Sequence, residues 1–303
     1  MTPTLGALPA RFRRPRLLIV GCGDVGQRVA KVLSTRLSVL ALTSSPERVP
    51  TLRSQHITPL IGNLDDTRSI ARLAGLATHV LHLAPPPSEG WGDPRTRALT
   101  RTLRLRSAPN RLVYGSTSGV YGDLKGGKAF ETLPTAAHTP RAFRRVSAER
   151  TVRDIVHSSI LRIPGIYAPD RDGGTPKERL LKGTPVLQKQ DDVYTNHIHA
   201  DDLARACIAA LWRGRPQRIY NVNDDSRLKM GDYFDFAADL YGLPRPPRVP
   251  RSTAQDQLPL MLLSFMSESR QMDNTRMKRE LKLKLRYPTV KTGLLEGERP
   301  QLF

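Results

Sequence analysis

Short apolar runs, rich in β-branched residues, alternate with amphipathic stretches over the first half of the chain. The runs predict strands at residues 16–20, 38–43, 57–61, 79–84, 111–114 and 160–163. The stretches between them predict helices at residues 27–33, 67–76, 94–107 and 140–156. Nearly continuous apolar strands separated by single helices are typical of a parallel sheet covered on both faces, so we predict a doubly wound α/β fold.

The pattern changes after residue 167, where proline, glycine and charged residues become frequent. A helix at residues 200–212 and a strand at 218–222 then look like a return to the sheet, whereas later residues form short helices with proline-rich joints. We predict a first domain of residues 14–166, to which residues 193–225 return. A smaller C-terminal substrate lobe, made of residues 167–192 and 226–303, should cover the carboxyl ends of the strands.

Three glycines follow the first predicted strand with the spacing G-x-G-x-x-G. Gly21 permits a tight turn, Gly23 lacks a Cβ atom where a pyrophosphate would approach, and Gly26 lets the next helix pack closely. The N–H groups at the N-terminus of that helix would face the anion. With a strand before it and a helix after it, the motif predicts a Rossmann dinucleotide-binding domain; a glycine-rich turn that binds nothing is the alternative.

The net charge of +20 comes mostly from arginines that are scattered along the chain. Clusters at residues 11–16, 101–106, 141–153 and 213–218 contain few aromatic side chains that could stack on bases. We interpret the charge as an arginine-biased solvated surface, and nucleic acid is not the favoured partner. A protein that binds a polyanion is the competing interpretation.

Several classes of protein are disfavoured by the sequence. No apolar run is long enough to span a bilayer, and the first fifteen residues lack the apolar region of a secretory signal. Two cysteines, Cys22 and Cys207, do not suggest a disulfide framework, so we expect a cytoplasmic protein. We also expect a monomer or homodimer with a small-molecule substrate.

The segment N-H-I-H-A-D-D at residues 196–202 raises the question of a metal site. His197 and His199 alternate on one face of an extended segment, but two histidines fall short of a full ligand set. We therefore expect no metal, and we expect Asp201 or Asp202 to cap the following helix.

Five motifs occur in an order that resembles the NAD-dependent epimerase/dehydratase family, the extended branch of the short-chain dehydrogenases/reductases. They are G-C-G-D-V-G at 21–26, H-L-A-P at 82–85, V-Y-G-S-T-S-G-V-Y-G-D at 113–123, L-R-I-P-G-I-Y-A-P-D-R at 161–171 and N-H-I-H-A-D-D-L-A at 196–204. The first glycine spacing and a late R-Y-P-T-V-K-T-G-L at 286–294 resemble the atypical, YeeZ-like subgroup.

The resemblance implies a cofactor site. The glycines would hold the pyrophosphate with backbone N–H groups of Asp24 and Val25, Asp65 would lie near the adenine, and Ala84 and Pro85 would lie along the ribose.

The end of the second predicted strand bears on the choice between NAD and NADP. An NAD-specific member would carry an acidic residue there, whereas this chain has Ser44 and, shortly after, Arg48. These residues could bind a 2′-phosphate, so we favour NADP over NAD. An exposed Arg48 that contacts no ligand is the alternative.

The catalytic Ser/Thr, Tyr and Lys of the superfamily are only partly matched. The resemblance places Thr117 at the hydroxyl position, Arg145 at the lysine and Arg141 at the tyrosine. Ser116, beside Thr117, is expected to bind the cofactor. Because a guanidinium stays protonated, Arg141 is no proton donor. Tyr121 and Tyr167, both expected at the rim of the cleft, are the candidates to replace the tyrosine; for each, a purely structural role is the alternative.

Together these features predict an NAD(P)-dependent oxidoreductase, epimerase or dehydratase acting on a small polar or sugar-nucleotide substrate. Because the Tyr-x-x-x-Lys pair is replaced, a non-catalytic NAD(P)-binding redox sensor or scaffold is the alternative.

Overall fold

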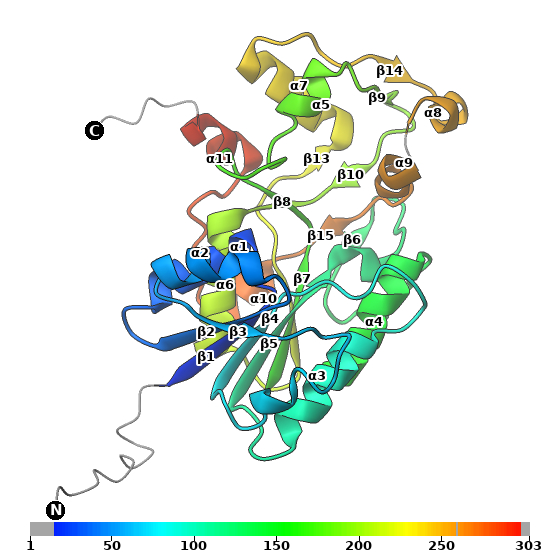
Figure 1. Cartoon of the computed structure of the whole chain (residues 1–303). Helices are drawn as coiled ribbons and strands as arrows, with labels where there is room; N and C mark the ends of the chain where they lie inside the picture. Colours follow the sequence, from blue (N-terminus) through cyan, green and yellow to red (C-terminus); the bar gives the residue numbers. More distant parts are fainter. Residues whose placement is uncertain (1–14, 259, 298–303) are drawn as a thin grey trace, which may run out of the picture.

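The computed structural model describes residues 15–258 and 260–297 (Figure 1). Its centre is a seven-stranded sheet with the order β12-β7-β5-β4-β1-β2-β3, in which every neighbouring pair is parallel. The strands are β1 (Arg16–Val20), β2 (Ser38–Thr43), β3 (Thr58–Ile61), β4 (His79–His82), β5 (Arg111–Thr117), β7 (Ser158–Ile163) and β12 (Arg218–Asn221). The doubly wound parallel-sheet fold predicted from the apolar runs is therefore confirmed.

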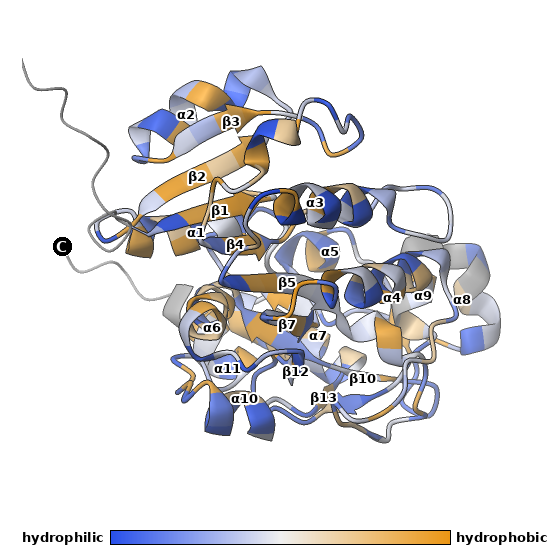
Figure 2. Cartoon of the chain, turned by 90° about the horizontal axis from the view of Figure 1, so that it is seen from below, coloured by the Kyte–Doolittle hydropathy of each residue, from blue (hydrophilic) through white to orange (hydrophobic). Residues whose placement is uncertain are grey.

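Helices cover both faces of this sheet because successive side chains of each strand point to opposite sides. In β1, Leu17 and Ile19 pack on one side with residues of α1 (Asp24–Leu33) and α6 (Ala200–Arg213). Leu18 and Val20 pack on the other side with α3 (Pro94–Arg104) and α4 (Pro140–Val152). Figure 2 shows the hydrophobic strands enclosed between these two layers.

One predicted helix is wrong. Residues 67–76 form turns around a short 3-10 segment, η3 (Ala71–Leu73), instead of a helix. Side chains here bond to the nearby backbone: Asn63 accepts from the N–H of Asp65, and Asp66 accepts from the N–H of Arg68. Such local hydrogen bonds compete with the helical ladder.

A second group of elements lies beyond the carboxyl ends of the strands (Figure 1). Its helices are α5 (Lys177–Leu181), α7 (Met230–Tyr241), α8 (Arg251–Gln257), α9 (Leu260–Met266) and α11 (Val290–Gly297). They share a separate hydrophobic core that includes Leu180, Phe234 and Val290.

Short strand pairs join this group to the sheet. The central pair is β8 (Gly165–Tyr167) with β11 (His197–His199), which run parallel. The others are β10 (Tyr194–Thr195) with β13 (Leu228–Lys229), β9 (Val186–Leu187) with β14 (Arg248–Val249), and β6 (Lys128–Ala129) with β15 (Gln271–Met272). The remaining elements are η2 (Pro46–Arg48), α2 (Val49–Ser54), η4 (Ser118–Tyr121) and α10 (Thr275–Glu280).

The start of α6 corrects another expectation. His199, and neither aspartate, is the N-cap, and its Nδ1 accepts from the N–H of Asp201 at 3.2 Å. Asp202 is fully buried and accepts from the backbone N–H groups of Arg286 and Tyr287. Its carboxylate therefore anchors the segment before α11. In the described part of the chain, no helix is both long enough and apolar enough to cross a membrane.

Candidate active site

Two cavities adjoin where the sheet meets the second group of elements. The smaller, of about 250 Å³, lies along the glycine turn and the ends of β4, β5 and β7. The larger, of about 560 Å³, is lined mainly by residues of the second group. Both are lined by Thr117, Arg141, Pro164, Ile166 and Arg171. A molecule in one cavity would therefore reach a molecule in the other at this junction.

The glycine turn has the geometry that a pyrophosphate requires. Gly21 has a φ of +88°, and a Cβ atom there would lie 2.3 Å from the amide nitrogen of Ala84. A Cβ on Gly26 would lie 3.2 Å from both the Gly21 carbonyl oxygen and Ile19 Cγ2. A Cβ on Gly23 would meet no atom within 4 Å, so this residue faces open space at the start of α1. These residues fit a dinucleotide phosphate at the helix N-terminus.

Ion pairs hold the glycine turn to distant segments. Arg28 on α1 donates to Asp24, Asp170 and Asp201. Arg171, which follows β8, donates to the second carboxylate oxygen of Asp24 at 3.1 Å. The loop after β8 is thereby fixed over the smaller cavity.

Five other residues expected to bind the cofactor do not line this cavity: Ser44, Arg48, Asp65, Ala84 and Pro85. Arg48 is half-buried, and its Nη2 donates to the carbonyl oxygen of Cys22 at 2.5 Å, which places the guanidinium beside the glycine turn. Ser44 is exposed at the end of β2. The amide nitrogen of Ala84 donates to the carbonyl oxygen of Val20 at 2.9 Å.

Asp65 and Pro85 are brought together by a residue that the sequence did not single out. Arg95 holds the Asp65 carboxylate with two hydrogen bonds of 2.7 and 2.6 Å, and its Nη1 lies 3.5 Å from the Pro85 carbonyl oxygen. The Arg95 guanidinium lowers the pKa of the Asp65 carboxyl.

The hydroxyl groups at the end of β5 differ in their partners. Thr117 is partly exposed at the junction of the cavities, and its Oγ1 accepts from the N–H of Gly119 at 3.4 Å. Ser116 lines the smaller cavity, but its hydroxyl donates to buried Glu149, which also pairs with Arg162. Thr117 is the hydroxyl that can meet a substrate.

The two arginines that the resemblance assigns to the tyrosine and lysine positions, Arg141 and Arg145, both line the cavities. Arg145 lines the smaller cavity, and its Nη1 donates to the hydroxyl of Tyr114 and the carbonyl oxygen of Gly115. Arg141 lines both cavities near Thr117. The junction therefore carries positive charge at the place where the resemblance would put a tyrosine.

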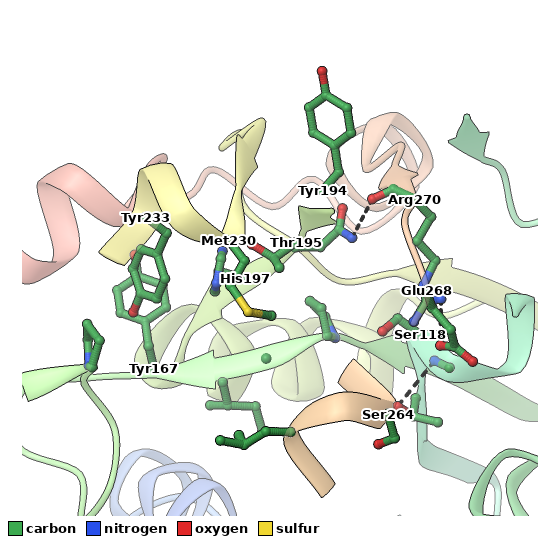
Figure 3. A pocket seen from close by; sticks show the side chains of 18 of the residues that line it. Ser118, Tyr167, Tyr194, Thr195, His197, Met230, Tyr233, Ser264, Glu268 and Arg270 are labelled. Carbon is green, nitrogen blue, oxygen red and sulfur yellow. Dashed lines mark hydrogen bonds and ion pairs between the residues drawn. The ribbon is translucent and has the colours of Figure 1, made fainter. Parts of the chain in front are cut away.

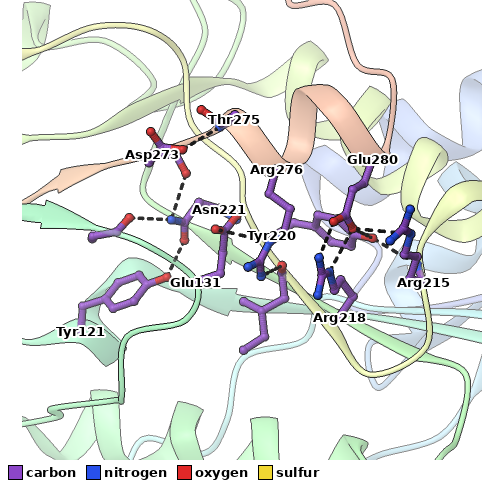
Figure 4. A network of polar contacts seen from close by, with 12 residues as sticks. Tyr121, Glu131, Arg215, Arg218, Tyr220, Asn221, Asp273, Thr275, Arg276 and Glu280 are labelled. Carbon is purple, nitrogen blue, oxygen red and sulfur yellow. Dashed lines mark hydrogen bonds and ion pairs between the residues drawn. The ribbon is translucent and has the colours of Figure 1, made fainter.

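The structure corrects the expectation that Tyr121 lies at the rim of the cleft. Its side chain is 1% exposed and is absent from the walls of both cavities. Its hydroxyl donates to Asn221 Oδ1 at 2.7 Å, within the polar network of Figure 4. Burial raises the pKa of this phenol. These contacts favour a structural role.

Tyr167 lines the larger cavity but is poorly placed to donate a proton. Its hydroxyl already donates to the carbonyl oxygen of Thr289 at 3.2 Å, and the side chain is 2% exposed. Burial and the nearby Asp224 carboxyl raise its pKa. These contacts favour a structural role for Tyr167 over a catalytic one.

We expect Tyr121→Phe to destabilise the fold without changing catalysis. The variant leaves buried Asn221 Oδ1 without its donor, which costs about 1–3 kcal/mol of the free energy of unfolding. Urea unfolding and initial rates of wild type and variant check this. A variant with wild-type stability but a turnover about 100-fold lower would show that Tyr121 is the proton donor after all.

The larger cavity is walled by residues that the sequence did not connect (Figure 3). Tyr167, His197 and Tyr233 group on one side, and Ser118, Glu268 and Arg270 lie on the other. Arg179 of α5 and Phe234 of α7 also line it. Of these residues, the sequence had singled out only Tyr167, as a candidate acid, and His197, from its place in the H-I-H segment.

The two histidines of the H-I-H segment pack against aromatic side chains. His199 lies 3.8 Å, ring to ring, from Tyr287, and His197 lies 4.4 Å from Tyr233. Over the described residues, no three His, Cys, Asp or Glu side chains gather closely enough to hold a metal ion.

Comparisons with known proteins agree with this architecture. The model of the NAD dependent epimerase/dehydratase family matches residues 17–223. A functionally unknown conserved protein from Silicibacter pomeroyi is 30% identical, with a TM-score of 0.79 over 93% of this chain and 97% of that chain. No curated protein sequence matches.

Two more distant structures share the fold. The UDP-glucose 4-epimerase of Thermotoga maritima, solved with UDP-glucose, is 18% identical, with a TM-score of 0.76 over 92% of this chain and 96% of that chain. A dTDP-glucose 4,6-dehydratase from Streptomyces venezuelae, solved with NAD and TYD bound, is 20% identical, with a TM-score of 0.74 over 93% and 95%.

Proposed function

Because this chain belongs to the NAD-dependent epimerase/dehydratase family, we propose that it is an NAD(P)-dependent oxidoreductase, epimerase or dehydratase. Its substrate is a small polar molecule or a sugar nucleotide. The observation that carries the proposal is the junction of the two cavities at Thr117. A bound nicotinamide cofactor would supply the hydride acceptor or donor in this chemistry.

The residues of the chain then have separate tasks. Thr117 holds the reacting oxygen of the substrate, Arg145 donates to the nicotinamide ribose, and the glycine turn binds the pyrophosphate. Tyr121 and Tyr167 donate their hydroxyls elsewhere, so the proton at the substrate oxygen comes from water or from a group of the substrate. Arg141 places a cation beside that oxygen.

Cofactor fluorescence and a screen of sugar nucleotides test this function. We expect NADPH or NADH to bind, and at least one substrate to change the absorbance of the nicotinamide or to be converted with the cofactor present.

A non-catalytic cofactor-binding sensor or scaffold is the second candidate, and the arginine at the tyrosine position favours it. If the screen finds no turnover in wild type while Arg141→Tyr with Arg145→Lys creates some, the enzyme proposal fails and the sensor stands.

We also propose that NADP is preferred over NAD, because Arg48 lies beside the glycine turn and Ser44 ends β2 without a carboxylate. Arg48→Ala should weaken NADP binding by about 1.5–3 kcal/mol, the worth of a hydrogen bond to a charged group, and NAD binding much less. Fluorescence titration of NADPH and NADH measures both affinities. Arg53→Ala, an exposed arginine on α2, is the matched control. An equal loss for the two cofactors would show that Arg48 does not contact the 2′-phosphate.

A further inference from the structure

Arg171 lies where the two cavities and the glycine turn meet. It follows β8 and lines both cavities. Its Nη1 donates to Asp24 Oδ2 at 3.1 Å, although the two residues are 147 positions apart. Asp24 is the first residue of α1, directly after Gly23, and it also lines the smaller cavity. The guanidinium of Arg171 is therefore held at the helix end to which the pyrophosphate binds in the proposed function.

This guanidinium has room for a second partner. The bond to Asp24 is its only hydrogen bond with a residue that the structure describes. The side chain is 29% exposed, and none of its nitrogen atoms is sealed from solvent without a partner. Arg28, the other arginine at Asp24, differs, because its Nε, Nη1 and Nη2 already donate to the carboxylates of Asp24, Asp201 and Asp170. Of these two arginines, only Arg171 has donors left for a further anion.

The ion pairs around Asp24 leave negative charge at the start of α1. Three carboxylates, those of Asp24, Asp170 and Asp201, share the guanidiniums of Arg28 and Arg171. The group therefore carries one negative charge in excess. A pyrophosphate at the same helix N-terminus brings further negative charge, and like charges so close together repel. The cation that offsets this repulsion needs a free donor, as Arg171 has.

The other arginines of the smaller cavity belong to its β5 side. Arg141 and Arg145 also line it, so it is lined by three arginines and, among the described residues, by one carboxylate, that of Asp24. Both extend from α4, which packs against β5. Arg145 is held there by the carbonyl oxygen of Gly115, and β4 separates β5 from β1 in the sheet. Arg171 is thus the cation at the α1 side of the cavity.

We propose that Arg171 is a ligand of the cofactor, and that its guanidinium donates to the pyrophosphate at the N-terminus of α1. The carboxylate of Asp24 acts in the opposite direction, because it holds Arg171 and repels the phosphates. The inference rests on the proposed function, since it adds a residue of the substrate lobe to the cofactor site. Residues 173–176, in the same segment, line the larger cavity, so a cofactor bound to Arg171 also fixes one wall of the substrate site.

Two variants that break the same ion pair test this inference. Arg171→Met removes the guanidinium, whereas Asp24→Asn removes the negative charge and keeps the size of the side chain. We expect Arg171→Met to bind NADPH and NADH about tenfold or more weakly, as for the loss of a charged hydrogen bond. We expect Asp24→Asn to bind both about two- to tenfold more tightly, the effect of removing one like charge beside a partly exposed site. Titration by nicotinamide fluorescence measures all these affinities.

The direction of the change separates a ligand from a structural residue. If Arg171 only held the turn through Asp24, both variants would lose the same pair and both would bind more weakly. The pair is partly exposed and contributes little to stability, so both variants should melt within a few degrees of wild type.

Two further variants serve as controls. Arg101→Met, an exposed arginine on α3, removes one positive charge elsewhere and should bind both cofactors as wild type does. Arg171→Lys keeps the charge without the planar fork of donors, so it should bind more weakly than wild type and more tightly than Arg171→Met. It carries the test together with Asp24→Asn if the methionine variant does not fold.

Three results would overturn the inference: Arg171→Met binding both cofactors as wild type does, Asp24→Asn binding them more weakly, or a loss in Arg171→Met confined to NADPH, which would place the guanidinium at the 2′-phosphate. If NADPH binding depends on Arg171 but no substrate is converted, the enzyme proposal fails and this inference stands. If substrates are converted and Arg171→Met binds the cofactor as wild type does, only this inference fails. A wild type that binds neither cofactor would overturn both.

Discussion

Gly23→Val is expected to weaken cofactor binding about 100-fold or more while leaving the fold intact. The backbone of Gly23 has φ −79° and ψ −156°, an extended conformation open to valine, and a Cβ there meets no protein atom within 4 Å. The branched side chain would instead fill the space in which the pyrophosphate sits. We expect the affinity for NADPH and NADH to fall about 100-fold or more, which corresponds to about 2.7 kcal/mol. Titration by nicotinamide fluorescence measures the loss.

The neighbouring glycine is the matched control for this prediction. Gly21→Ala adds a Cβ atom 2.3 Å from the amide nitrogen of Ala84, at a φ of +88°. It should therefore lower the melting temperature, because strand β4 and the turn must separate. If Gly23→Val left both the cofactor affinity and the melting temperature unchanged, the pyrophosphate would not bind at the glycine turn.

Thr117→Val is expected to lower turnover by about 100- to 10,000-fold, the usual worth of a positioned acid–base or polarising group. Valine keeps the shape of threonine but removes the hydroxyl at the junction of the two cavities. The cofactor should still bind, since the glycine turn is untouched. Initial rates and NADPH titrations of the same preparations separate the two effects.

Thr117→Ser restores a hydroxyl and should recover most of the activity. This control matters because Thr117 Oγ1 also accepts from the N–H of Gly119, so a loss in Thr117→Val could arise from a disturbed η4. Full activity in Thr117→Val would show that the substrate oxygen is held by another group, with Arg141 the next to test.

The half of the site around the glycine turn could be predicted because its chemistry is contiguous. Gly21, Gly23 and Gly26 act within one strand–turn–helix unit, and their spacing alone determines the surroundings of each. Gly21 lies against the end of β4, Gly23 faces open space, and Gly26 packs against β1. The predicted strands fell within a few residues of the observed ones for the same reason: each is a local apolar run buried in the parallel sheet.

Local patterns failed where nearby polar side chains or distant partners decided the outcome. Residues 67–76 have apolar positions at helical spacing, yet Asn63 and Asp66 bind the backbone and hold turns. Tyr121 follows the Ser-Thr-Ser segment closely enough to suggest a catalytic role, but its hydroxyl finds Asn221, one hundred positions away.

The sequence by itself determined the doubly wound sheet and the glycine turn, because each depends on residues a few positions apart. Only the tertiary structure decided what the second cavity offers a substrate. Arg179, His197 and Phe234 come from α5, β11 and α7, and no spacing relates them. They line one cavity because β8 pairs with β11 and the lobe packs its own core.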